Sequence, residues 1–325
     1  MVQQESSSPR RRPGTLRRTT TLDVLWPDGI DGMVRFEGIG RDVMTGQDGG
    51  LAVVEQISIA VDVDPIGREV VAVEAHGSDG AQSVVGARIG RGVREAMQAG
   101  MAAEVGRGAP AVQLLDDMTG AWIVGSYAVF LWGHGDTGVT LGSTTRRKME
   151  GVCLGFAPGS SAVAADGGVN DRHMSAEVDD LVDPHDPDGW HDLPSRSGMS
   201  LRRARRLDVA VTDNDIMIDS MFQDSSTQPN GGRAGVHQYG VTAIVARDDL
   251  VLRQIAADPR ILPYGECPMA MLGLPGLVGT TLVGLRDVVP TRLKGVQGCT
   301  HLNDAVRALS LMEGRAISMC SSPAH

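Results

Sequence analysis

The sequence predicts an α+β protein in which antiparallel sheets are combined with a few helices, in two pseudo-symmetric halves from an internal duplication. Hairpin patterns occur in both halves, and a helical pattern follows each of them. Two similar strings, LRRTTTLDV at 16–24 and LRRARRLDV at 201–209, precede the hairpins at an offset of about 185 residues. LLDD at 114–117 and HLND at 301–304 repeat this order at an offset of about 187 residues. Two such copies are expected to pack about an approximate two-fold axis.

The first repeat is expected over 14–132, after a disordered arm at 1–13 that contains Ser, Gln, Pro and Arg without periodicity. Near-alternating β-branched residues over 51–73, interrupted by Asp-Pro-Ile-Gly, predict a hairpin. Apolar residues spaced by three and four over 84–103 predict an amphipathic helix. The apolar run at 121–131 predicts a strand.

A connector that is first Gly-rich and then acidic is expected over 133–200, followed by the second repeat over 201–325. The pattern at 236–258 predicts another hairpin, which turns at Arg-Asp-Asp. Pro275 and several glycines predict that a helix within 266–282 is short or broken. A last amphipathic helix is expected over 301–312, with Thr300 as its N-cap.

A basic run follows the connector directly. We expect it to pair with the acidic residues of the connector or to protect a strand edge from aggregation, rather than to bind nucleic acid. The run consists of Arg202, Arg203, Arg205 and Arg206.

The overall charge narrows the class of partner. The 325 residues carry 40 Asp and Glu against 30 Lys and Arg, a net charge of -10, which argues against binding of nucleic acid through phosphate contacts. No apolar run of about 18 residues is present, which argues against a membrane span. We therefore expect a cytoplasmic protein in which the four cysteines stay reduced. The expected partner is a hydrophobic small-molecule substrate. A homodimer stays open as the oligomeric state.

Candidate reactive side chains concentrate in the second repeat. Acid–base catalysis needs a group that titrates near neutral pH and a partner that orients it. The side chains that supply both kinds are His237, Tyr239, Glu266, His301 and Asp304, with Asp224 as a further carboxylate. The same residues also fit a purely structural interpretation, in which they are buried and hydrogen-bonded while the cysteines pack as small apolar residues.

A metal site is the alternative use of part of this set. Cys267, Cys299, His301 and His237 together would supply the four ligands of a tetrahedral zinc ion. Structural zinc sites usually take cysteines in pairs such as C-x2-C, and here each segment offers only single cysteines or a C-x-H pair. We therefore expect no cofactor, and zinc stays as the alternative.

Several motifs of the chain resemble the DUF2889 family, bacterial proteins without an assigned function. These motifs include RRPGTLRRTTTLDV, LLDDM, MSLRRARRLDV, FQDS, VHQY, ILPYGECPMA and GCTHLNDAVRAL, and they spread over most of residues 11–313. The resemblance implies a shared site around Cys267, Cys299 and His301, and a role in the catabolism of aromatic, steroid or other hydrophobic compounds. Family members usually carry Glu where this sequence has Gln238.

Two hypotheses of different classes follow. The first is a cofactor-independent lyase that acts by acid–base chemistry on a hydrophobic hydroxylated or phenolic compound, for example by retro-aldol or formaldehyde-releasing cleavage of a lignin-type aromatic dimer. His237 or His301 would be the base, Tyr239 or a carboxylate the acid, and Asp304 the orienting group. The second is a non-catalytic binding or accessory protein, which includes the variant with a structural Cys and His metal site.

Overall fold

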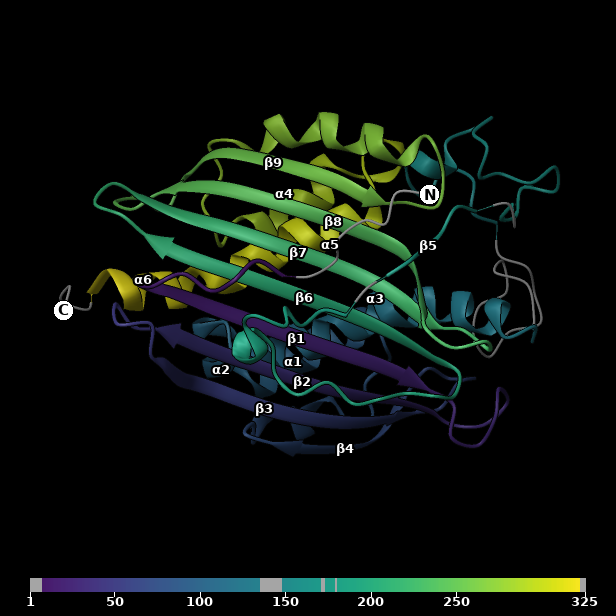
Figure 1. The fold of residues 1–325 in the computed structure, drawn as a ribbon. Coiled ribbons are helices and arrows are strands. Elements are labelled where there is room, and N and C mark those ends of the chain that lie inside the picture. Colours follow the sequence, from purple (N-terminus) through teal and green to yellow (C-terminus); the bar gives the residue numbers. More distant parts are fainter. Residues whose placement is uncertain (1–7, 135–147, 171–172, 179, 322–325) are drawn as a thin grey trace.

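The fold is that of a computed structural model, which describes residues 8–134, 148–170, 173–178 and 180–321. As predicted, it is α+β and dominated by a large antiparallel sheet (Figure 1). Within the described residues the strand order is β4-β3-β2-β1-β6-β7-β8, and both β5 and β9 pair with the free side of β8. The strands are β1 Thr15–Leu25, β2 Val34–Thr45, β3 Leu51–Val63, β4 Val70–His76, β5 Ala176–Glu177, β6 Ser200–Val211, β7 Asp215–Thr227, β8 Arg233–Ala246 and β9 Leu252–Ile261.

Helices follow the strands of each half. The α-helices are α1 Arg91–Gly100, α2 Ala102–Arg107, α3 Pro110–Leu131, α4 Leu285–Arg292, α5 Thr300–Leu309 and α6 Glu313–Ser321. The 3-10 segments are η1 Gly80–Val84, η2 Leu154–Phe156, η3 Pro187–Gly189, η4 Cys267–Leu277, η5 Gly295–Gln297 and η6 Ser310–Met312. Among the described residues, no helix combines the length and the apolar character that crossing a membrane requires.

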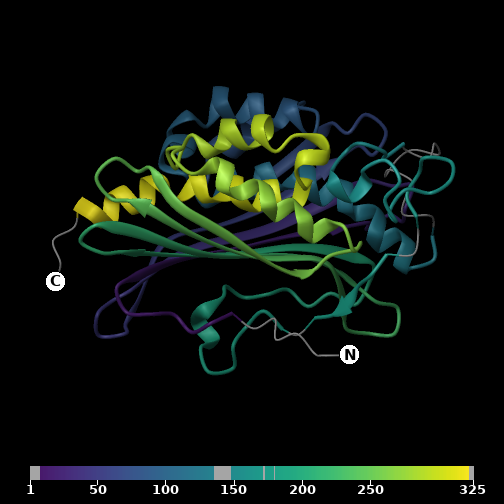
Figure 2. The ribbon, with the colours of Figure 1, turned by 90° about the horizontal axis from the view of Figure 1, so that it is seen from above.

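The α-helices cover one face of the sheet, and much of the connector crosses the other face (Figure 2). Strand alternation sends every second side chain toward the helices. In the first half, this places the Phe36 ring against the Trp122 ring of α3, with centroids 6.2 Å apart. In the second half, Ile218 and Phe222 of β7 join a separate apolar core with Leu302 of α5. The helical face therefore buries two apolar clusters, one formed mainly by the first half and one mainly by the second.

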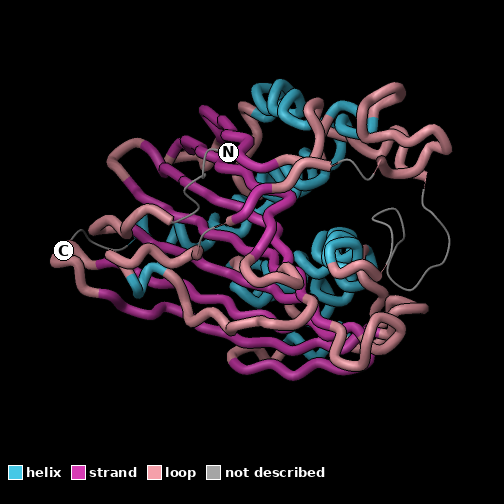
Figure 3. The backbone as a smooth tube through the Cα atoms, turned by 45° about the vertical axis from the view of Figure 1, so that its right-hand side comes forward, coloured by secondary structure: helices cyan, strands magenta, loops and turns pink. Residues whose placement is uncertain are grey.

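The two halves meet where β1 pairs with β6, so that their strands form one continuous sheet (Figure 3). Because β1 is covered on both faces, its polar side chains are buried as well. On the connector face, the ring nitrogens of His191 lie 2.9 Å from the Thr19 hydroxyl and 2.8 Å from the Thr21 hydroxyl. Burial lowers the pKa of His191 to about 3, so this ring joins connector and sheet as a neutral hydrogen-bonding group.

The structure confirms both predicted hairpins. They are β3 with β4 and β8 with β9, and both are antiparallel. The amphipathic helix expected over 84–103 is present as α1, with α2 directly after it. The broken helix expected over 266–282 is the 3-10 segment η4. The last predicted helix begins at Thr300 as α5, but its N-cap is Cys299 rather than Thr300.

The strand predicted at 121–131 was wrong, because these residues form the second half of α3. Apolar runs that are buried on all sides show neither the period of a strand nor that of a surface helix. Pro110 occupies the first turn of α3, where proline is well tolerated, and 22 residues continue from it as one helix. Most of this helix is buried, so it lacks the polar face by which a sequence pattern identifies an amphipathic helix.

Of the arm expected at 1–13, residues 1–7 lie outside the described residues, and from Ser8 onward the chain contacts the connector. The Trp190 indole N–H donates to the Ser8 hydroxyl at 2.7 Å. The Arg11 guanidinium donates to Asp186 at 2.6 Å. Trp190 and Asp186 of the connector thus hold Ser8 and Arg11 against the protein, contacts that the irregular composition of this segment did not predict.

We expect Gly108→Ala to destabilise the protein. Gly108 ends α2 in a left-handed conformation with φ of 63°, and an added Cβ would lie 1.9 Å from the Leu311 carbonyl oxygen. Backbone strain of this kind is worth about 1–3 kcal/mol, and the clash adds to it. Gly106→Ala is the matched control, because a Cβ at Gly106 within α2 meets no atom within 4 Å. Urea unfolding should show a loss for the first variant only; equal midpoints would contradict the described backbone.

Candidate active site

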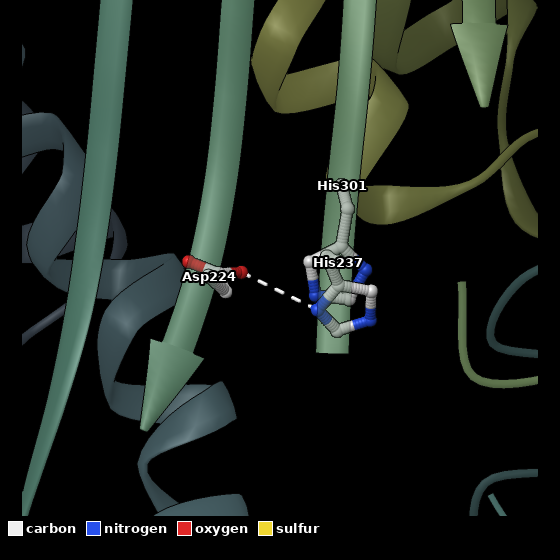
Figure 4. A group of neighbouring side chains, drawn as sticks. All are labelled: Asp224, His237 and His301. Carbon is white, nitrogen blue, oxygen red and sulfur yellow. Dashed lines mark ion pairs between the residues drawn. The ribbon is translucent and has the colours of Figure 1, made fainter. Parts of the chain in front are cut away.

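Three of the predicted side chains come together on the helical face of the second half. Asp224 of β7, His237 of β8 and His301 of α5 bring one nitrogen or oxygen atom each within 4.8 Å of one another (Figure 4). The His237 Nδ1 atom lies 3.3 Å from Asp224 Oδ2. The His237 and His301 rings are stacked, with centroids 3.4 Å apart and planes inclined by 19°. This set is the centre of the candidate site.

Strand register and helix position explain the convergence. Asp224 and His237 are direct partners across β7 and β8, immediately before a β-bulge at Asp224 and Ser225. Directly opposed residues share a face of the sheet, so both side chains point toward the helices. His301 lies in the first turn of α5, which packs on these two strands. Segments far apart in sequence are thereby placed at one point.

Arg203 of β6 fixes the charge of Asp224. Its guanidinium donates to both carboxylate oxygens, from Nε at 2.8 Å and from Nη2 at 3.0 Å. Burial alone would raise the pKa of Asp224, but Arg203 and the neighbouring His237 outweigh it and hold that pKa below its ordinary value. Asp224 is therefore a carboxylate at neutral pH although it is fully buried.

The two imidazoles are neutral for the opposite reason. Burial lowers the pKa of His237, although the carboxylate of Asp224 opposes this shift. Burial also lowers the pKa of His301 well below 6.5, and the His237 ring beside it lowers it further. Each ring nitrogen without a proton is then a base, and the partly exposed His301 is the imidazole that lies nearer to solvent.

A network of buried charges surrounds Arg203. Its Nη1 atom donates to Asp304 Oδ2 at 3.4 Å and lies 3.6 Å from Asp117 of α3. Arg205 donates to both oxygens of Asp117, at 2.6 and 2.7 Å. The two guanidinium carbons lie 4.9 and 4.6 Å from the centre of the Phe222 ring, which in turn stacks with His301. The site therefore rests on paired charges that are buried on the helical face.

The expectation for the basic run was wrong for its central members. Arg203 and Arg205 are two residues apart in a strand and both point to the helical face, where they bind Asp117 and Asp224. Arg202 points the other way but binds Asp23 of β1 rather than the connector acids, at 2.7 Å. The period of two was the signal that could have divided the run between the two faces.

Gly120 of α3 makes room for this guanidinium. A Cβ at that position would lie 1.7 Å from Arg203 Nη1. Because Arg203 is fully buried and held by Asp224, it has little freedom to move aside. Gly120, Asp117 and Arg203 surround the candidate site but were not among its predicted residues. For Gly120 and Asp117, nothing local in the sequence indicates this position.

The other predicted residues lie outside the three-residue set. Tyr239 is fully buried, and its hydroxyl donates to Cys299 Sγ at 3.6 Å. Burial raises the pKa of Tyr239 above its ordinary value, so this hydroxyl stays protonated. Glu266 accepts hydrogen bonds from the Ser161 N–H at 2.8 Å and from the Ser161 hydroxyl at 2.7 Å. Asp304 binds Arg203, while Asp224 is the carboxylate beside His237.

The predicted zinc set is not assembled as such. Two of its members, His237 and His301, do meet, but Asp224 rather than Cys267 or Cys299 completes the compact group among the described residues. Burial raises the pKa of Cys267 to about 12 and also raises that of Cys299, so both are thiols at neutral pH. They pack in the apolar core of the second half.

Two adjoining hollows lie on the connector face of the sheet, of about 290 and 590 Å³. Both are lined by Pro9, Asp219 and Thr242, and neither is lined by His237 or His301.

Comparison with known proteins adds one match of consequence. Residues 201–313 match a family described as "Protein of unknown function (DUF2889)", which confirms the resemblance over the part of the chain that carries the candidate site. No curated protein of known function matches the sequence. Among solved structures, the crystal structure of a lipopolysaccharide binding protein aligns at 10% identity over 89% of this chain and 92% of the other, with a TM-score of 0.12, too low to support an argument.

Proposed function

We propose that this chain, whose residues 201–313 match the DUF2889 family, is a lyase that cleaves a hydrophobic hydroxylated or phenolic compound by acid–base chemistry without a cofactor. One observation carries the proposal: the buried Asp224 carboxyl group lies 3.3 Å from His237 Nδ1, and the His301 ring stacks on the His237 ring. Such a set of titratable groups, whose environments push their pKa values apart, is typical of proton-transfer sites.

The chemistry is a retro-aldol cleavage. His301 removes the proton of a substrate hydroxyl, and the electron pair of that O–H bond forms the C=O bond of the released aldehyde. The adjacent C–C bond breaks, and its electron pair passes to a neighbouring carbonyl as an enolate. The imidazolium of His301 then returns the proton to the enolate carbon, while the Asp224 carboxylate stabilises the transient positive charge. Nothing is oxidised or reduced.

The substrate class follows from the surroundings of the imidazoles. Phe222 stacks with His301, and the second apolar core lies directly around it. The resemblance to DUF2889 adds aromatic and other hydrophobic carbon sources. We assign the reaction to the cytoplasm, where such catabolic enzymes work on imported compounds.

We also infer that the two halves descend from one duplicated unit. Thr20 and Arg205 hold the same place in the two similar strings, and they are direct partners across β1 and β6, as a local two-fold axis through this pair would require. Bulges follow Asp42 in the first half and Asp224 in the second. Each of these aspartates pairs with the arginine at the third place of its string, Arg18 or Arg203.

The direct test uses aryl ketones that carry a hydroxymethyl group on the carbon next to the carbonyl. Cleavage of the bond between the hydroxymethyl carbon and this neighbouring carbon releases formaldehyde. Formaldehyde is measured colorimetrically, and the shortened ketone is measured in the same sample. We expect equal amounts of both products from purified protein. A panel of phenolic and non-phenolic ketones that all remain intact would contradict the proposal.

A non-catalytic accessory protein is the second candidate. The observation that favours it is the position of the two hollows on the connector face, away from the imidazoles. Saturable binding of the same ketones without any turnover, unaffected by loss of His301, would favour this candidate over the lyase.

A further inference from the structure

The donor atoms at the centre of the site form a compact set. Among the residues that the structure describes, the group Asp224, His237 and His301 is the one in which three such ligand atoms lie within 4.8 Å of one another. We propose that these three side chains bind a borderline transition-metal ion of the Zn²⁺ class. The inference goes beyond the proposed function. An imidazole nitrogen that binds a metal cannot also accept a proton, so the bound ion would block the general base of the proposed reaction.

The chemistry of the donors fits such an ion. Imidazole nitrogen suits Zn²⁺ and its neighbours in the first transition row, and one carboxylate oxygen completes a common three-ligand set. Neutral imidazoles bind metal without first losing a proton. The three ligands come from β7, β8 and α5, which bring their backbones close together. Because the lone pair of an imidazole nitrogen lies in the plane of its ring, binding of one ion by both histidines turns the rings out of their stacked arrangement.

Arg203 supports this site indirectly, through hydrogen bonds to the ligand Asp224. Its Nε and Nη2 atoms hold both oxygens of Asp224, which fixes the carboxylate in one orientation. Hydrogen bonds of this kind to a ligating carboxylate are a regular part of metal sites. The guanidinium also repels a cation, so we expect the affinity to be lower than in a site with two free carboxylates.

The thiols belong to a neighbouring but separate group. Cys299 is two residues from His301, yet its sulfur accepts a hydrogen bond from Tyr239. Cys267 Sγ lies against Gly155, where an added Cβ would be only 2.7 Å from it. This contrast gives the experiment its control, because a thiol-ligated metal and an Asp-His-His metal respond to different substitutions.

The experiment measures Zn²⁺ binding to the metal-free full-length protein by calorimetry, with Co²⁺ absorption as a second readout. We expect one ion per chain, and a loss of affinity of more than about tenfold in His237→Gln and in His301→Gln. Cys299→Ser and His191→Gln should bind as the native protein does, His191 being a buried histidine of the opposite face. Absence of binding, or loss in Cys299→Ser with retention in His301→Gln, would overturn the inference. Thermal melts show whether each variant is folded.

Turnover measured on the same samples keeps the two proposals apart. Inhibition by one equivalent of Zn²⁺ supports the metal site and the metal-free acid–base reaction together. Turnover without any binding of Zn²⁺ overturns the metal site and leaves the lyase. Turnover that requires Zn²⁺ supports the metal site and overturns the metal-free reaction.

Discussion

Replacing Arg203 by Met is expected to lower the free energy of unfolding by about 3–5 kcal/mol. The methionine fills much of the same volume but leaves Asp224 buried without its guanidinium partner, and it also removes a partner from Asp304. An isolated carboxylate cannot keep its charge in such a place, so we expect Asp224 to take up a proton. Urea unfolding at neutral pH measures the loss.

The first half of the chain supplies the matched control. Arg18 holds Asp42 through Nε and Nη2, both at 2.7 Å, in the arrangement that Arg203 and Asp224 have. Asp42 has a second partner, because Arg315 donates to it at 2.8 Å. Arg18→Met should therefore cost less stability than Arg203→Met. Equal losses, or a smaller loss for Arg203→Met, would show that Asp224 does not depend on Arg203.

The second large effect concerns activity. We expect His301→Ala to reduce turnover of a cleaved ketone by about 10²–10⁴, the usual contribution of a positioned general base. The unfolding free energy should change little, because the His301 side chain is partly exposed and holds none of the buried ion pairs. His191→Gln is the control with the reverse pattern, since it removes a buried contact on the opposite face. Collapse of the fold in His301→Ala, or turnover at the native rate, would contradict the assignment of His301 as the general base.

The pH dependence of turnover follows from the same burial. The pKa values of His237 and His301 are both lowered, so the neutral base is present at every pH above the ordinary histidine value of 6.5. Turnover should be level from there to mildly alkaline pH, and it should fall only when the pH drops below 6.5 and the imidazoles gain protons. A rate that rises steeply between neutral and alkaline pH would point to Tyr239 or a thiol as the base.

Much of the second half was predictable because its signals are local. Hairpin alternation and the apolar face of α5 placed His237 and His301 on regular elements. The long helix α3 could not be recognised, because a helix that is apolar on all sides has no periodic signature.

The polar centre of the site was less predictable. Asp224 was a candidate, but its pairing with Arg203 depends on strand register, which single-sequence patterns do not reveal. The choice of Asp224 over Asp304 as the neighbour of His237 depends on register as well, and so does the separation of Cys299 from the imidazoles.

The central claim is that Asp224, His237 and His301 meet as one carboxylate and two neutral imidazoles. Nitrogen-15 NMR of the histidine side chains tests it directly, with His237→Gln and His301→Gln to assign the signals. We predict that both rings are neutral at pH 6.5 and that the His237 proton resides on Nδ1, the nitrogen that lies 3.3 Å from Asp224 Oδ2. Two rings that titrate independently at the ordinary histidine pKa, with mixed tautomers, would contradict the account.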